Sequence, residues 1–202
     1  MMTSLGAYGL SRKNLYWGKS MMLFIIFTMF FSGGLIPSFL LVKGIGLYNS
    51  RFALIFPSAI STMNLIIMRT NFQAIPESLE ESARIDGAND LQIMMRVIIP
   101  LSGSVMAVMT LFYGVAHWNS WFNAMIYLRD RTSYPLQLVL REILISNQTQ
   151  NMTQDVGDLD KLSVSETIKY ATIMVATVPI LLVYPFLQKY FVKGVMIGAV
   201  KG

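Results

Sequence analysis

Four long stretches without a charged residue are the strongest constraint on how this chain can fold. They run over Ser20–Val42, Phe52–Met68, Val97–Leu128 and Tyr170–Gln188. A helix that crosses the hydrocarbon core of a bilayer needs about 20 predominantly apolar residues. The stretches therefore predict an all-α membrane protein with about four membrane helices in this chain.

The composition points the same way. Hydrophobic residues make up 54% of the chain and charged residues 13%, whereas a typical soluble domain is about 25% charged. The mean hydropathy is +0.53. Without cysteine and with one histidine, the chain has no disulfide, cysteine-based metal site or all-histidine metal site, so we expect no bound metal or cofactor.

A charged insert, Ile75–Pro100, lies between two of the predicted spans and reads IPESLEESARIDGANDLQIMMRVIIP. Pro76 suits a first helical turn, and the glutamates that follow suit the positive end of a helix dipole. Gly87 takes a positive φ at little cost and so ends the helix. Asn89 or Asp90 can cap a second helix. The insert therefore predicts two short helices joined by a tight elbow, in which a Cβ at Gly87 would clash.

The first of these helices carries an apolar stripe. Ile75, Leu79 and Ala83 recur at helical spacing and share one face. An apolar face that is exposed to the cytoplasm gains nothing by staying in water. We therefore expect a partner protein to cover the stripe in a groove, with Glu80, Glu81 and Arg84 pairing at its rim.

The insert resembles the cytoplasmic EAA loop of permease subunits of ATP-binding-cassette (ABC) importers. The matching residues are Glu81, Ser82, Ala83, Ile85, Asp86, Gly87, Ala88, Ile99 and Pro100. The chain departs from the family pattern at Ser82 and at Ser104, and neither change removes the elbow. The resemblance implies one transmembrane domain over residues 1–202 with its coupling loop at 75–100, and it implies that the ATPase-coupling residues are Leu79, Glu80, Glu81, Ala83, Asp86, Gly87, Ala88 and Pro100.

The resemblance also implies the partners and the location. A second homologous permease, two ABC ATPase subunits and an extracytoplasmic sugar-binding protein are expected, in a bacterial inner membrane with both termini of this chain cytoplasmic. The chain has no glycine-rich phosphate-binding loop, so it is predicted not to be an enzyme, and ATP and Mg²⁺ are used by the partner ATPase. The net charge of +5, without a basic patch interleaved with aromatic residues, suits anionic lipid and does not suggest nucleic acid.

A polar and aromatic cluster near the end of the third predicted span is the candidate substrate path. Aromatic faces and amide groups are the side chains that recognise sugars. We expect His117 and Trp121 to share a helical face, with Tyr113 one turn away. An interfacial aromatic belt is the alternative for the tryptophans, and helix-to-helix hydrogen bonding is the alternative for the asparagines. The candidate path residues are Tyr113, His117, Trp118, Asn119, Trp121 and Asn123.

Two sequence strings favour a carbohydrate substrate. The string HWNSWFNAMIYL and the tail YFVKGVMIGAVKG at 190–202 resemble the branch of carbohydrate permeases that handles oligosaccharides such as aldouronates. The predicted function is therefore that of a permease subunit of an oligosaccharide importer. An amino-acid or peptide importer and a non-transporting membrane scaffold remain the alternatives.

The relatives in this family normally have six membrane helices, and the resemblance starts near the end of their second. It implies an amino-terminally shortened form or a misplaced start codon, with a genuine four-helix permease as the alternative. The stretch Arg129–Lys169 is the only long soluble stretch. It is expected to be an outer loop, either simply solvated or a docking surface for the binding protein.

Overall fold

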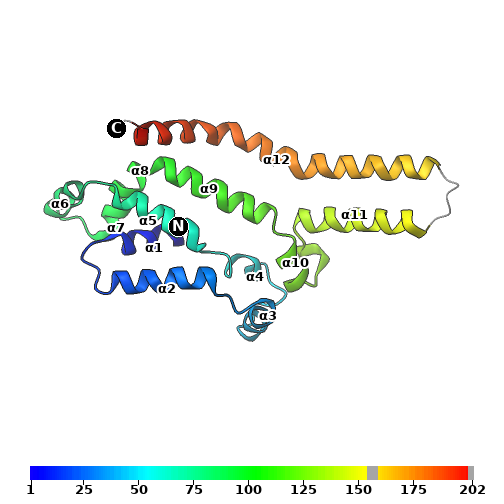
Figure 1. The fold of residues 1–202 in the computed structure, drawn as a ribbon, viewed down its shortest axis with the longest axis horizontal. Coiled ribbons are helices and arrows are strands. Elements are labelled where there is room, and N and C mark those ends of the chain that lie inside the picture. The colour runs from blue at the N-terminus through cyan, green and yellow to red at the C-terminus, as the bar shows by residue number, and fades with distance from the viewer. Residues whose placement is uncertain (154–158, 200–202) are drawn as a thin grey trace. The chain divides into compact units, whose positions relative to one another are not determined.

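A computed structural model describes residues 1–153 and 159–199, and its regular secondary structure over those residues is entirely helical (Figure 1). The all-α prediction is confirmed for this part of the chain. The elements are α1 Met2–Ser11, α2 Gly18–Phe30, α3 Leu35–Gly44, α4 Phe52–Ile55, α5 Thr62–Gln73, α6 Glu77–Ile85, α7 Asp90–Ile93, the π-helix η1 Met94–Ile98, α8 Ile99–Leu101, α9 Gly103–Trp118, α10 Phe122–Tyr127, the 3-10 helix η2 Arg131–Ser133, α11 Leu136–Thr153 and α12 Leu159–Ala199.

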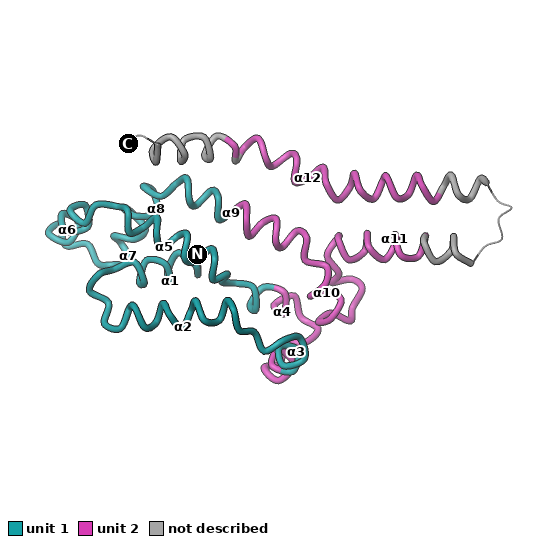
Figure 2. The backbone as a smooth tube through the Cα atoms, in the orientation of Figure 1, with its two compact units in different colours: residues 1–40, 55–110, 190–202 teal, residues 41–54, 111–189 magenta. Residues whose placement is uncertain are grey.

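The chain forms two compact units, coloured separately in Figure 2. Unit 1 comprises residues 1–40, 55–110 and 190–202, and unit 2 comprises residues 41–54 and 111–189. In unit 1, α1 and α2 both pack on α5. Leu65, Met68 and Phe72 are buried on α5 at helical spacing, so one face of this short helix supplies much of the unit's core.

Unit 2 is held by a small apolar core and by one asparagine. Ala124, Leu128 and Leu138 are buried together. Asn49, with a φ of 58°, adopts the left-handed conformation that asparagine tolerates better than most residues. Its side-chain oxygen accepts hydrogen bonds from the backbone N–H groups of Arg129 (2.8 Å) and Asp130 (3.3 Å), which fastens the loop after α3 to the loop after α10.

The fourth predicted span is confirmed, and the other three are broken. Within α12, residues Ser165–Phe186 form a helix long and apolar enough to cross a membrane. The first and third predicted spans correspond to helix pairs that are sharply bent, by 115° between α2 and α3 and by 88° between Asp90–Leu101 and α9. Counting each bent pair as one span, the described residues contain at most three spans, one fewer than expected.

The breaks have local causes. Gly34 takes a φ of +86° between α2 and α3, a conformation that glycine adopts without the steric cost of a Cβ. The second predicted span, Phe52–Met68, divides into the single turn of α4 and the start of α5. Pro57 lies in the interruption, and a proline cannot donate the backbone hydrogen bond that would continue the helix.

The stretch Arg129–Lys169, predicted as a long outer loop, is largely helical over the residues that the structure describes, and its place outside the membrane stays a prediction. Helix α11 begins at Leu136, and α12 already includes the residues from Leu159. The carbohydrate-type tail at 190–202 lies outside the residues whose side chains the structure describes.

The role of Asn49 leads to a stability prediction. Asn49→Ala should lower the free energy of unfolding by about 1 to 2 kcal/mol, because it removes three exposed side-chain hydrogen bonds, including the one that Asn49 Nδ2 donates to Asp130 Oδ2 at 3.0 Å, and disfavours the positive φ. Asn49→Gly keeps the backbone conformation and should cost less. Thermal unfolding of the purified protein in detergent measures both changes, and an unfolding midpoint for Asn49→Ala equal to that of the wild type would contradict this role.

Candidate functional site

Helix α6 forms where the charge pattern predicts it. Pro76, in an extended conformation, takes the N-cap position immediately before the helix, and Glu77 and Glu80 lie in the first turn. These carboxylates face the positive end of the helix dipole, while Arg84 occupies the last turn at the negative end. The sequence therefore stabilises a short helix that has a charged, water-exposed location.

The predicted elbow at Gly87 is confirmed. Gly87 has a φ of +81°, and two hydrogen bonds close the end of α6, from Gly87 N to the Arg84 carbonyl (3.0 Å) and from Ala88 N to the Ala83 carbonyl (2.9 Å). This is the pattern by which a left-handed residue satisfies the last carbonyls of a helix. The chain therefore reverses direction within one residue.

The second half of the elbow is fixed by a capping box. Of the two predicted caps, Asn89 is the one that caps α7: its side chain accepts from Gln92 N (2.8 Å), and the Gln92 side chain accepts from Asn89 N (3.0 Å). The Asp90 carboxylate instead forms an ion pair with the guanidinium of Arg84, with 2.7 Å between Asp90 Oδ1 and Arg84 Nη2. The two helices are thus linked across Gly87 by a side-chain bridge as well as by the backbone.

The expected steric clash at Gly87 is wrong. A Cβ built at Gly87 meets no atom within 4 Å. The need for glycine comes from the positive φ alone, which is strained for a residue with a Cβ and most of all for a β-branched one. A small polar residue that tolerates the left-handed region should therefore replace Gly87 more easily than valine does.

The predicted coupling residues that belong to α6 lie on two different faces of the helix. Leu79 is 42% exposed and Ile85, which the stripe did not include, is 86% exposed. Glu80 is only 6% exposed and forms an ion pair with Arg12, so the expectation that it lies at an accessible rim beside Glu81 and Arg84 is wrong. Of the remaining coupling residues, the structure leaves Glu81 and Asp86 exposed, Ala83 and Ala88 half-buried, and Pro100 exposed in α8.

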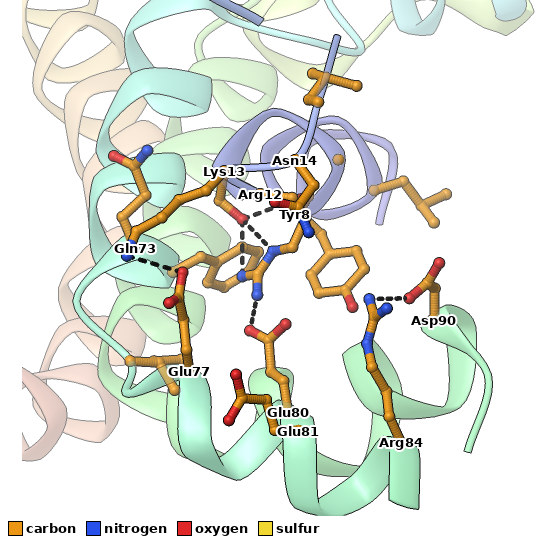
Figure 3. A pocket seen from close by; sticks show the side chains of 16 residues that line it. Tyr8, Arg12, Lys13, Asn14, Gln73, Glu77, Glu80, Glu81, Arg84 and Asp90 are labelled. Atoms are coloured by element: carbon orange, nitrogen blue, oxygen red, sulfur yellow. Dashed lines mark hydrogen bonds and ion pairs between the residues drawn. The ribbon is translucent and has the colours of Figure 1, made fainter. Parts of the chain in front are cut away.

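The sequence did not single out the residues on the other side of this contact. Arg12 and Lys13 follow the last turn of α1 and reach α6 across a pocket lined by α1, the end of α5 and α6 (Figure 3). Lys13 pairs with Glu77 at 2.9 Å. Burial lowers the pKa of the Arg12 guanidinium, yet arginine remains protonated in proteins, so the contact with Glu80 is a charged one.

The candidate path residues all lie in unit 2. Helix α9 ends at Trp118, and Trp121 takes the N-cap position of α10. The prediction that His117 and Trp121 share a helical face is therefore wrong, because the helix is interrupted between them. The structure places Tyr113, His117 and Trp118 on α9, Asn119 in the interruption, and Asn123 in α10; His117 and Asn119 are exposed and the others, with Trp121, are half-buried.

The two tryptophans have defined packing roles. The indole N–H of Trp118 donates to the Ala176 carbonyl of α12 at 3.0 Å, so helix packing accounts for this residue. Trp121 packs against the apolar core of unit 2, and the guanidinium of Arg141 lies 3.4 Å above the centre of its ring. Arg141 was absent from the predicted path, because it lies 20 positions after Trp121 and the sequence gives no sign of a contact at that separation.

The chain is similar in sequence and in fold to known transport proteins. Residues 4–197 match the family described as "Binding-protein-dependent transport system inner membrane component". The chain is 49% identical over its full length to the polygalacturonan/rhamnogalacturonan transport system permease protein YtcP of Bacillus subtilis and 45% identical over 97% of its length to the protein LplC of the same organism. A crystal structure of a bacterial ABC transporter involved in the import of the acidic polysaccharide alginate matches 95% of the chain with a TM-score of 0.81 and 36% identity.

The chain belongs to the family of inner-membrane components of binding-protein-dependent transport systems. Its fold is accordingly that of an ABC importer transmembrane domain. The chain spans 70% of the length of YtcP, 66% of that of LplC and 70% of the matching chain in the alginate transporter.

The elbow yields a local prediction. Gly87→Val should weaken the two hydrogen bonds that close α6 by about 1 to 2 kcal/mol, because valine resists a positive φ. The amides of residue 87 and Ala88 should then exchange with solvent about five to thirty times faster, as hydrogen exchange followed by mass spectrometry can measure. Gly87→Asn should remain close to the wild type, and equal exchange in the valine variant would show that the elbow does not depend on glycine.

Proposed function

We propose that this chain is the permease subunit of an ATP-driven, binding-protein-dependent importer of oligosaccharides and forms half of its translocation path. The exposed elbow formed by α6 and α7, with Gly87 at a φ of +81°, is the observation that carries the proposal. The family match over residues 4–197 supports it. So do the names of relatives that transport polygalacturonan, rhamnogalacturonan or arabinooligosaccharides.

In this proposal the elbow is the part of the chain that contacts a cytoplasmic ATPase. Leu79 and Ile85 are apolar and exposed on α6, and a groove on the ATPase would remove them from water, with Glu81 at its edge. ATP and Mg²⁺ are bound by the ATPase, and this chain supplies no catalytic group. Closure of the ATPase dimer moves the elbow as a rigid element and changes which side of the membrane the path faces.

The remaining partners follow from the same assignment. Both termini of this chain are proposed to be cytoplasmic, and the ion pairs of Arg12 and Lys13 with α6 support this for the amino-terminal segment, because they hold it beside the elbow. Large apolar side chains are exposed on α2 and α12, including Phe24, Phe30, Leu181 and Phe186. Such surfaces suit lipid and a second, homologous permease. A second ATPase and an extracytoplasmic sugar-binding protein complete the proposed importer.

The substrate is proposed to be an acidic oligosaccharide. Two relatives carry names of acidic polymers, polygalacturonan and alginate. In unit 2, the guanidiniums of Arg141 and Arg129 lie over the rings of Trp121 and Tyr48. Neither arginine pairs with a carboxylate among the described side chains, so both keep N–H groups suited to a uronate carboxylate. Asn119, exposed between α9 and α10, supplies an amide for sugar hydroxyls.

The ATPase contact is tested at Leu79. Leu79→Asp places a charge in a contact that must lose water, so it should release the ATPase subunits without unfolding the membrane helices. Leu79→Met preserves the apolar contact and should retain them. Copurification of the ATPase with each variant measures the effect, and wild-type recovery with Leu79→Asp would show that the ATPase docks elsewhere.

The substrate assignment is tested by uptake into vesicles that contain the complete importer. Arg141→Gln and Asn119→Ala should each reduce uptake of galacturonate oligosaccharides about tenfold while basal ATPase activity is unchanged, because each removes a hydrogen bond to the cargo. Arg131→Gln is the matched control, since Arg131 is already paired with Glu142 at 3.2 Å. Undiminished uptake by both path variants would remove these residues from the path.

A further inference from the structure

The end of α1 is joined to α6 through a charge that is largely shielded from water. The carboxylate of Glu80, 6% exposed, forms an ion pair with the guanidinium of Arg12. Figure 3 shows Arg12 pointing from α1 toward this carboxylate. A buried carboxylate that loses its charged partner is strongly disfavoured. The contact therefore holds the two segments together whenever both side chains are charged.

Arg12 is held in position before it meets Glu80. Its Nε and one terminal nitrogen donate to the hydroxyl of Ser11 at 3.0 and 2.9 Å, and that hydroxyl donates to the Tyr8 carbonyl at 2.7 Å. The guanidinium also lies 4.6 Å from the centre of the Tyr8 ring. The flexible arginine side chain is thereby already directed toward α6. This reduces the conformational entropy that it loses when the ion pair forms.

The segment that carries Arg12 is itself fixed to α5. Arg69 of α5 donates from Nε to the Leu10 carbonyl at 2.8 Å, and this bond satisfies a carbonyl in the last turn of α1. Ala7 of α1 and Phe72 of α5 are completely buried in the packing of unit 1. The last turn of α1, helix α5 and helix α6 thus form a connected block within unit 1.

The two faces of α6 are used differently. Glu77, Glu80 and Arg84 follow one another at intervals of three and four residues and share one face. That face meets α1 through Arg12 and Lys13. Leu79 belongs to another face and is exposed. Helix α6 can therefore be held by α1 on one side while the other side remains available to a partner.

We propose that Arg12 is a positioning residue for energy coupling, which transmits movement of α6 to α1 through Glu80. The proposal rests on the proposed function, because it assumes that the ATPase moves α6. Arg12 touches neither ATP nor sugar. Its role is to make the end of α1 move with α6. A displacement of α6 would then reach α1 as well as α7, which continues the chain after Gly87.

The neighbouring ion pair provides a matched control. Lys13 and Glu77 join the same two segments one residue away, at 2.9 Å, but their side chains are 78% and 55% exposed. Exposed pairs contribute little because water screens them. Lys13→Gln should therefore leave coupling close to wild type, whereas Arg12→Gln should not.

The experiment uses the complete importer reconstituted in vesicles with its ATPases and loaded binding protein. Arg12→Gln should retain the ATPase subunits and the basal rate of hydrolysis, while stimulation by loaded binding protein and uptake per complex fall at least about fivefold. Arg12→Lys should retain part of the stimulation. The exchanged pair, Arg12→Glu with Glu80→Arg, should restore at least half of it, because the attraction is re-formed with its signs reversed.

The outcomes separate the positioning role of Arg12 from the proposed function of the chain. Full stimulation in Arg12→Gln overturns the positioning role, and so does a failure of the exchanged pair to recover when that variant assembles normally. Loss of the ATPase subunits from Arg12→Gln also overturns it, since the residue would then act in assembly. If the wild-type importer shows neither uptake nor stimulation with any oligosaccharide, the proposed function fails instead.

A distance measurement tests the motion directly. The chain contains no cysteine, so Lys13→Cys with Glu77→Cys gives two labelling sites, one on each segment. Spin labels at these sites should keep the same distance distribution in the nucleotide-free and vanadate-trapped states, because the two segments move together. A shift between the two states would overturn the proposal even if Arg12→Gln impairs transport.

Discussion

The left-handed backbone at Gly87 is the constraint on which the arrangement of unit 1 depends. One residue with a φ of +81° ends α6, reverses the chain and leaves Asn89 in position to cap α7. Arg84 and Asp90 close the reversal from outside. The helix that ends here exposes Leu79 and Ile85 and buries Glu80.

The local features of this elbow could be read from the sequence because their causes are local. A glycine that favours a positive φ, an asparagine followed three residues later by glutamine, and glutamates in a first helical turn each act within a few residues. All three appear in the structure where the sequence places them. The helical class of the chain follows similarly from its long apolar stretches.

The features that the sequence did not reveal depend on residues far apart in the chain. Glu80 was expected at an accessible rim, and its burial requires Arg12, which lies 68 residues earlier, to approach from α1. The shared face expected for His117 and Trp121 fails because α9 ends at Trp118, where Asn119 and Ser120 turn the chain. Apolar content predicted membrane helices, but hydropathy does not report a bend such as that between α2 and α3. Tertiary contacts and backbone turns decide these points.

The π-helix Met94–Ile98 has a geometric consequence for everything that follows it. A π turn holds one residue more than an α turn, and each residue of an α-helix advances the side-chain direction by roughly 100°. In η1 the N–H of Ile99 donates to the Met94 carbonyl, five residues earlier. The additional residue enclosed by this bond therefore rotates the side chains after Ile98 relative to those of α7. A helical wheel drawn continuously through this region assigns Ile99, Pro100 and Leu101 to the wrong sides. Shortening the chain by one residue here would restore α-helical register and turn the elbow relative to the helix that continues from it.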